Sequence, residues 1–164
     1  MIQSINRTVC NALASVNSSY SGRLFACPKC GNTGNPYDGF CRECGYLLPK
    51  EQMMKRADEL LTRDLRLKTP HPIIGLAYLP GVGRIDLEIG HKGVGSAMER
   101  GSGLSKLLQK HEKLLKYLPA TLVLGKPCDS KEEGKIARYK DNLRTIIGKR
   151  PYGGTVVTIR KIKK

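Results

Sequence analysis

The stretch "RGSGLSKLLQKHEKLLKYLPATLVLGKP", residues 100–127, decides how the second half of this 164-residue chain folds. Its glycines predict a loop, and the leucines that follow recur at helical spacing, so we expect a helix over residues 102–116 and then a strand. His111 lies in this helix among lysines, close to the apolar side. It is either a surface residue of a basic helix or part of a site that other elements complete.

Strand patterns lie on both sides of this helix. Residues 73–79 and 84–89 precede it, and "RIDLEIG" in the second alternates apolar and charged side chains. Residues 134–140, 142–148 and 154–162 follow it, with a turn at "RPYGG" between the last two. Helices first and strands later are typical of an α+β domain with an antiparallel sheet, which we place at residues 73–164.

Two further helices are predicted before this domain. Residues 49–68, "PKEQMMKRADELLTRDLRLK", carry an apolar face and should end before "TPHP", because prolines remove donors. Residues 49–72 therefore form a connecting helix and linker. Residues 1–22 hold apolar side chains at helical spacing and predict an amphipathic helix. The lack of acidic residues before Asp38 is also typical of a mitochondrial transit peptide.

The stretch "CPKCGNTGNPYDGFCRECG", residues 27–45, contains two C-x2-C pairs separated by ten residues, each followed by a glycine. Two such turns bring four thiolates to one tetrahedral ion and leave no position open for water. We therefore predict one structural Zn²⁺ held by Cys27, Cys30, Cys41 and Cys44. An iron–sulfur cluster and disulfides are the alternatives, and disulfides need an oxidising compartment that nothing in the sequence indicates. The fragment resembles the small zinc-ribbon family "CPxCG…FCxxCG", so residues 23–48 are interpreted as a zinc ribbon.

The charge is strongly positive and unevenly distributed. The chain carries +15, of which residues 101–164, with sixteen basic and five acidic residues, contribute +11. Such a field favours phosphate backbones or anionic membrane surfaces, and of these we expect nucleic acid, although a solubilising lysine surface has the same composition. No apolar run is long enough for a membrane span, so we expect no membrane partner. The expected phosphate contacts are Lys106, Lys110, Lys113, Lys140 and Arg160. Tyr139 and Tyr152 are candidates for base stacking, although tyrosines on strands more often pack within the sheet.

A second resemblance covers roughly residues 81–164. The run "GVGRIDLEIG…GVGSAMERGSGLSKLLQKHEKLLKYLPATLVLGKP" resembles phage- and mobile-element-associated members of the barnase, EndoU, colicin and RelE-like nuclease fold. The matching residues are Gly83, Ile85, Asp86, Gly90, Gly103, Leu104, Leu107, Leu108, His111, Leu118, Pro119 and Gly125. The resemblance implies a barnase/RelE-like domain of helix and antiparallel sheet that acts as an endoribonuclease.

Metal-independent RNA cleavage needs a base for the 2′-OH, an acid for the leaving oxygen and cations for the phosphate. Histidine suits either proton role, and arginine matches phosphate oxygens. We therefore predict a catalytic set of His111, Arg138, Arg144 and Thr155, with Thr158 as a substitute for Thr155. His91 is a candidate second proton-transfer group, and His71 is interpreted as a turn residue.

Two other functions remain open at this stage. Helices of the nucleases that this chain resembles often carry a further histidine near the positions of Ser105 or Lys106. Here those positions hold serine and lysine, and the missing histidine favours a non-catalytic RNA- or DNA-binding protein. The ribbon would alternatively dock on a host or virion protein. The nuclease resemblance implies a toxin-like protein of a phage or mobile element, in the bacterial host cytoplasm or associated with a virion.

Overall fold

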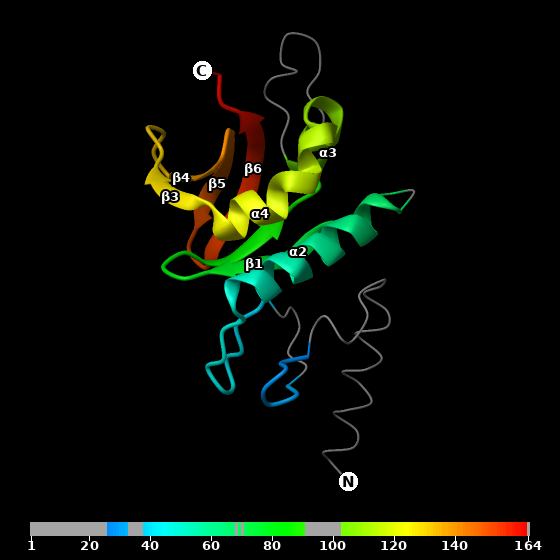
Figure 1. The fold of residues 1–164 in the computed structure, drawn as a ribbon, viewed down its shortest axis with the longest axis vertical. Helices are drawn as coiled ribbons and strands as arrows, with labels where there is room; N and C mark the ends of the chain where they lie inside the picture. The colour runs from blue at the N-terminus through cyan, green and yellow to red at the C-terminus, as the bar shows by residue number, and fades with distance from the viewer. Residues whose placement is uncertain (1–25, 33–37, 68, 70, 91–102, 164) are drawn as a thin grey trace.

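The computed structural model describes residues 26–32, 38–67, 69, 71–90 and 103–163. Within these residues, six strands form one sheet in the order β1-β2-β6-β5-β4-β3, with helices against it (Figure 1). The α+β class is therefore confirmed, whereas the helix predicted for residues 1–22 lies outside the described residues. In chain order the elements are α2 (Lys50–Leu65), β1 (Ile73–Leu79), β2 (Gly83–Leu87), α3 (Gly103–Lys110), η3 (Glu112–Tyr117), α4 (Leu118–Leu124), β3 (Lys126–Asp129), β4 (Lys135–Lys140), β5 (Leu143–Arg150) and β6 (Gly153–Lys161).

Helix α2 lies where the sequence places it. It begins after Pro49, ends at Leu65 before the prolines, and packs against β1 and α4. Its buried apolar side chains recur three and four residues apart, which gives one face to the core. On the same face, the buried Arg56 donates to the carbonyls of Gly75 and Leu76 at 2.8 and 3.2 Å. These bonds fasten β1 to the helix.

The sheet is mixed, so the prediction of a purely antiparallel sheet is wrong at one junction. β2 runs parallel to β6, with Asp86 opposite Thr155, while every other neighbouring pair is antiparallel. The chain between β2 and β6 contains α3, η3 and α4, and parallel strands require a long connection of this kind. Alternation within a strand does not reveal the direction of its neighbour.

The helix predicted over residues 102–116 is interrupted at His111. This residue has φ −133° and ψ 25°, and the chain continues as the 3₁₀ helix η3. The strand expected next is also wrong over Leu118–Leu124, which form α4 with Pro119 in the first turn. Because α4 is buried around most of its circumference, its apolar run shows no helical period.

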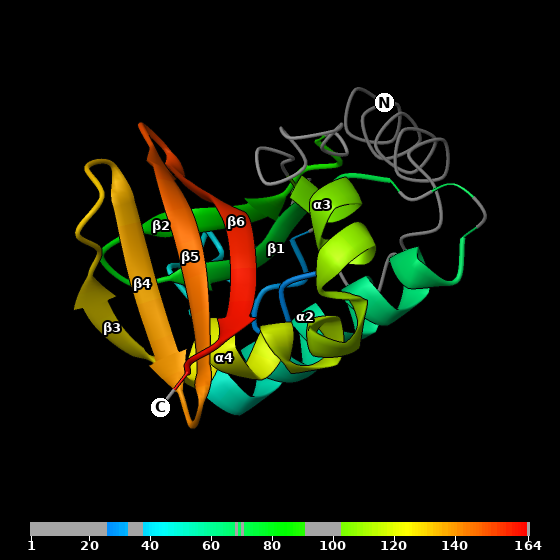
Figure 2. The same ribbon diagram turned by 90° about the horizontal axis from the view of Figure 1, so that it is seen from above.

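The helices cover one face of the sheet. α4 packs against β4 and β5, whereas α3 and η3 pack beside β6, beyond the point where β2 stops pairing with it. Figure 2 views β4, β5 and β6 from the side opposite α4, and shows β1 and β2 crossing them at a steep angle. We call the face opposite α2 and α4 the open face, because no described helix packs over it.

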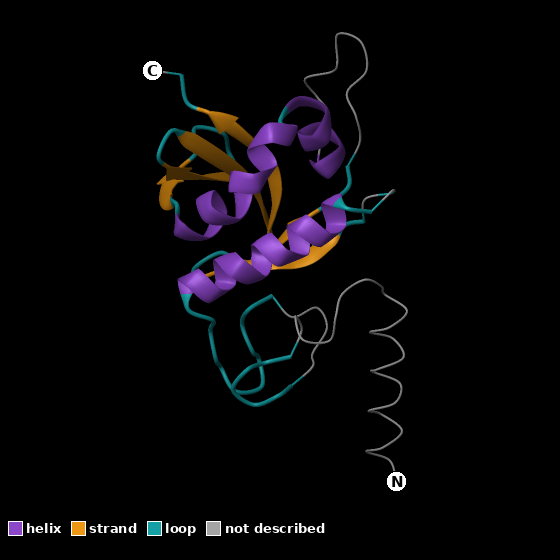
Figure 3. Ribbon diagram, turned by 45° about the vertical axis from the view of Figure 1, so that its right-hand side comes forward, coloured by secondary structure: helices purple, strands orange, loops and turns teal. Residues whose placement is uncertain are grey.

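The cysteine-rich segment docks against β1 and α2, below α2 in Figure 3. The Phe40 ring stacks on Tyr78 with centroids 4.8 Å apart. Gly39 has φ +99°, and a Cβ there would overlap the Met53 side chain, so the backbone approaches α2 more closely than other residues allow. The fully buried Asp38 pairs with Arg42 at 2.8 Å and accepts the Phe40 N–H.

Candidate metal site and basic surface

The four predicted metal ligands form one cluster. The Sγ atoms of Cys27, Cys30, Cys41 and Cys44 all lie within 4.8 Å of one another, and the Cys27–Cys44 and Cys30–Cys41 pairs are 3.7 and 3.6 Å apart. Four sulfurs at about 2.3 Å from one tetrahedral ion would be separated by about 3.8 Å. The donor set and its dimensions therefore fit a metal ion.

The local backbone produces this geometry twice. Gly31 N–H donates to the Cys27 carbonyl and Gly45 N–H to the Cys41 carbonyl, both at 2.8 Å. Both glycines have positive φ, 75° and 73°, which side chains disfavour. The C-x2-C-G spacing is thus the requirement of each turn, and this is why the sequence alone identified the site.

The thiols have unequal pKa values. At Cys27, burial raises the pKa, but the N–H groups of Cys30 and Lys29 outweigh it and lower the pKa to about 6. At Cys30 the Asn32 N–H lowers the pKa, but burial and the neighbouring sulfurs raise it to about 12. Adjacent thiolates thus oppose one another's ionisation, and a bound cation would relieve that repulsion.

The predicted catalytic set does not come together as one site. Arg138 on β4 points to the helix-covered face, where its Nη2 donates to the carbonyls of Gly125 and Val123 at 2.7 and 3.3 Å. These carbonyls end α4, so the guanidinium caps that helix, and burial lowers its pKa. Arg144 on β5 pairs with Tyr139 rather than with Arg138 and points to the open face.

Thr155 lies on the open face but near the far end of the strands. Its Oγ1 donates to the Asp86 carbonyl oxygen at 3.3 Å, and it pairs with Gly148, four residues along β5 from Arg144. That separation is about 13 Å along the strand. Thr158 lies nearer to Arg160 on the same face, and its buried Oγ1 has no hydrogen-bond partner among the described residues.

His111 lies beside the open face, near enough to Arg160 on β6 for that charge to act on its pKa. Its pKa is lowered by burial first and then by the charges of Arg160, Lys106 and Lys110. Among the described residues, every charged group that acts on its pKa is therefore a cation. The lowered pKa favours the neutral imidazole, and the cations that act on it attract anions.

A line of side chains crosses four strands next to His111. Lys126 on β3 pairs with Tyr139, Tyr139 with Arg144, and Arg144 with Arg160 on β6. We call these four residues the cationic row. Directly opposed like charges such as Arg144 and Arg160 destabilise a sheet, and none of the three cations forms an ion pair with a described carboxylate. The pKa of Glu132 is lowered chiefly by its hydrogen bond from Lys135. The charges of Arg144 and Arg160 lower it further.

The other predicted phosphate-binding lysines differ in their accessibility. Lys110 and Lys113 are exposed on α3 and η3, as Arg160 is on β6. Lys106 is buried at 6% exposure, so it cannot reach a phosphate without rearrangement. Lys140 pairs with Asp141 at 3.1 Å and points to the helix-covered side.

Sequence patterns missed Lys126 and the alignment of the row, because only the register of four strands brings these side chains together. His71 follows α2 as a non-regular residue, with its N–H on Asp64 Oδ1 at 2.9 Å, whereas His91 lies outside the described residues. None of the described helices is long and apolar enough to cross a membrane. Comparison of the chain with family models, curated proteins and solved structures finds no match, so the nuclease resemblance stays a prediction.

Proposed function

We propose that the protein binds RNA through the open face of its sheet, with the cationic row as the phosphate-binding surface. The observation that carries this proposal is the register of Lys126, Arg144 and Arg160 with Tyr139 between them. Unpaired cations in line attract a phosphate backbone, and an intervening aromatic ring offers a base a stacking partner. The four cysteines hold zinc, and the metal is structural because four thiolates fill its coordination.

Salt dependence tests the row. For single strands each phosphate contact contributes about −0.7 to the slope of log K against log[salt], so three cations predict a slope of about −2. The double substitution Arg144→Gln/Arg160→Gln should reduce that slope by about 1.4, measured by anisotropy of labelled single-stranded RNA. Lys149 and Lys161 lie on the same two strands but alternate to the other face, so Lys149→Gln/Lys161→Gln is the matched control. Equal losses from both double variants would mean that only net charge matters.

A second candidate is metal-independent RNA cleavage, favoured by the position of the neutral His111 beside Arg160. His111 would take the proton of the 2′-OH, and Arg144 and Arg160 would stabilise the charged phosphate. We rank it second because the charged groups that act on His111 are Arg160, Lys106 and Lys110, with no second histidine or carboxylate among them. The nuclease resemblance, and with it a phage or mobile-element setting in a bacterial host, belongs to this candidate.

Cleavage is tested with RNA and EDTA-treated protein. Products ending in 2′,3′-cyclic phosphate that disappear with His111→Gln but persist with Lys149→Gln would support it. Bound but intact RNA across a range of pH would leave binding as the function.

A further inference from the structure

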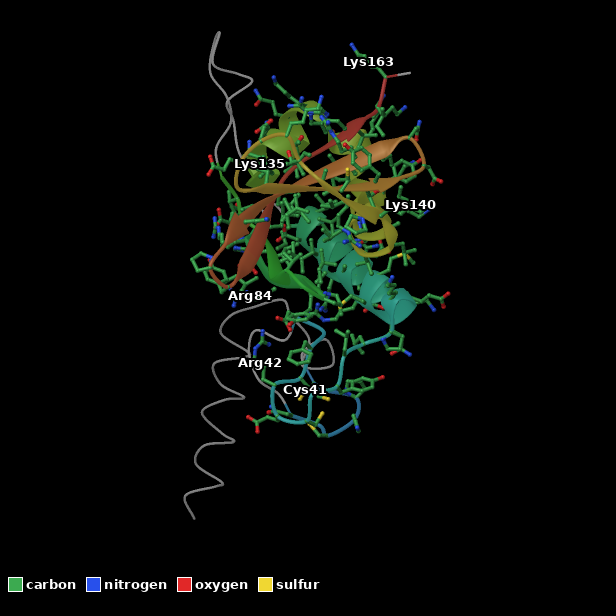
Figure 4. All side chains as sticks on the ribbon, turned by 90° about the vertical axis from the view of Figure 1, so that its left-hand side faces the viewer. Cys41, Arg42, Arg84, Lys135, Lys140 and Lys163 are labelled. Atoms are coloured by element: carbon green, nitrogen blue, oxygen red, sulfur yellow. The ribbon has the colours of Figure 1, made fainter. Side chains whose placement is uncertain are left out.

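A second set of side chains on the open face lies apart from the cationic row, where the ribbon meets the sheet. It consists of three arginines and three aromatic rings, and we call it the ladder: Arg42, Phe40, Tyr78, Arg84, Tyr152 and Arg150. The Arg42 guanidinium lies over Phe40 and Tyr78, with centroid distances of 5.8 and 6.0 Å. Figure 4 shows Arg84 at the sheet and Arg42 below it, next to Cys41 in the cysteine-rich segment.

The sheet register continues the ladder. Tyr78 on β1 pairs with Arg84 on β2, which is in register with Gly153 on β6, and Gly153 pairs with Arg150 on β5. The Arg84 guanidinium lies 5.0 Å from the centroid of the Tyr152 ring. Arg150 donates to the Tyr152 hydroxyl at 3.0 Å. Two arginines therefore hold one tyrosine ring in a defined orientation.

Tyr152 is the most accessible member among the aromatic residues of the ladder. It lies in the turn between β5 and β6 and is 52% exposed, although a ring of this size gains by burial. Because Arg84 lies against one face of the ring, the other face is the one available to a ligand. A rigid ring with one free face is the element on which unpaired bases stack in proteins that bind single strands.

The charge of the ladder differs from that of the row. Arg42 pairs with Asp38 at 2.8 Å, Arg84 with Asp86 at 2.9 Å, and Arg150 with Glu88. Each arginine is thus neutralised by one carboxylate, so the ladder attracts phosphate weakly. Its affinity for a ligand must come from stacking, which depends little on salt.

We propose that Tyr152, held by Arg84 and Arg150, is a stacking site for an unpaired nucleobase of the strand bound at the cationic row. This inference rests on the proposed function. Arg144 and Arg150 are separated by six residues of β5, or about 20 Å, so one strand would have to follow the sheet from the row to the ladder. The ribbon then contributes to binding, because Phe40 and Arg42 form the end of the same surface.

A tryptophan reporter tests the contact directly. The chain contains no tryptophan, so Tyr152→Trp introduces a single fluorophore at the site. Tyr117→Trp is the matched control, because Tyr117 is 44% exposed, lies next to Lys116 in η3 and belongs to neither the cationic row nor the ladder. Single-stranded RNA of about 16 nucleotides, a length within the range that single-strand-binding folds cover, should quench the fluorescence of the Tyr152→Trp variant and leave that of the control unchanged.

Affinity provides the second measurement. Tyr152→Leu should weaken binding of the same RNA by about fivefold or more, whereas Tyr152→Phe should stay within about twofold. The ratio should be the same at about 50 and about 200 mM salt. Single-stranded DNA of equal length distinguishes recognition of the base alone, which predicts equal quenching, from recognition that includes the ribose.

The outcomes separate the two proposals. If the wild-type protein binds no single strand at low salt, the proposed function fails. If it binds and depends on Arg144 and Arg160, but Tyr152→Leu binds as tightly as wild type, the stacking site is wrong and the row stands. Equal quenching of the two tryptophan variants would mean that the base contacts are unspecific, which would also overturn the stacking site.

Discussion

The cationic row and the sheet residues of the ladder lie on the same face of the sheet, and both sets combine cations with aromatic rings, yet only the row carries charge that no carboxylate of the described residues neutralises. The row places Lys126, Arg144 and Arg160 side by side without a carboxylate partner among the described residues, while each arginine of the ladder has its own. Unpaired cations gain from counterion release, and paired ones keep aromatic rings in place. An arginine therefore has to be judged by its neighbours before its role is assigned.

The largest expected effect comes from removing the metal, which should affect the ladder and spare the row. Metal binding supplies on the order of 10 kcal/mol to small four-ligand domains, and the Phe40–Tyr78 stack depends on the ribbon. Chelation, or Cys41→Ser, should abolish amide protection in residues 38–48 and weaken it in β1. Hydrogen exchange measures both segments.

Two comparisons control this experiment. Cys128→Ser alters a cysteine outside the cluster and should keep one metal ion per chain by metal analysis. Protection in β5 should persist after chelation, because its neighbours β4 and β6 do not touch the ribbon in the sheet order. Loss of protection in β5 at the same chelator concentration would show that ribbon and sheet unfold as one unit.

The next effect separates two arginines that the sequence makes equivalent. Arg138→Met should reduce the free energy of unfolding by about 1–3 kcal/mol, because the last carbonyls of α4 lose a charged donor. Arg144→Met should change that energy by less than about 0.5 kcal/mol, and it should reduce the salt slope of RNA binding instead. Urea unfolding and binding at two salt concentrations measure the pair. The assignment of faces is wrong if the two variants exchange these effects.

A smaller effect is expected when one arginine of the ladder loses its carboxylate partner, because that arginine then carries unpaired charge like those of the cationic row. Glu88→Gln removes the carboxylate partner of Arg150, and because Glu88 is half exposed the pair contributes less than about 1 kcal/mol to stability. The freed guanidinium should increase the salt slope of RNA binding by about 0.7. Glu133→Gln, at an exposed residue outside both sets, is the control for net charge. An identical slope in both variants would exclude Arg150 from the bound strand.

The smallest effect concerns the pH dependence of stability at His111. Its pKa is lowered in the folded protein by burial and by Arg160, Lys106 and Lys110, so below the unfolded value of about 6.5 the unfolded chain binds more protons. The contribution of His111 to stability is therefore present at pH 7 and is lost as the pH falls below about 6.5. Urea unfolding at pH 7 and at about pH 5.5 should show a larger loss for wild type than for His111→Gln. A larger loss in the variant would contradict the assigned shift.

Local features were predictable from the sequence because their causes are local. The ribbon follows from cysteine and glycine spacing, and α2 from the apolar face that ends before the prolines. The strands were placed within one or two residues, apart from β3. The predictions that were wrong concern features that depend on tertiary contacts. Helix α4 was predicted as a strand because it is buried on almost all sides, and the parallel pairing of β2 with β6 joins segments on either side of the helical region.

The open face could not be assigned from the sequence, because the assignment depends on which residues of each strand point away from α4. Arg138 and Arg144 are both on strands, and only the position of α4 decides which one faces outward. The pairing of β5 with β6 shifts in register between Ile146 and Ile147, which lets Thr155 and Thr158 share the open face although they are three residues apart. No sequence pattern indicates such a bulge.

The parallel pairing of β2 with β6 means that, during synthesis, the ribbon can fold several seconds before the sheet is complete. The ribbon joins cysteines 17 positions apart, whereas the Thr155–Asp86 contact spans 69. At about 5–20 residues per second, the ribosome needs about 3–14 s to make that interval, and for this time β2 has an uncovered edge. The ribbon and α2 are synthesised before then. Both pack against β1, the ribbon through the Phe40–Tyr78 stack. In the nascent chain, early metal loading would therefore help to cover β1 while β2 still lacks its partner β6.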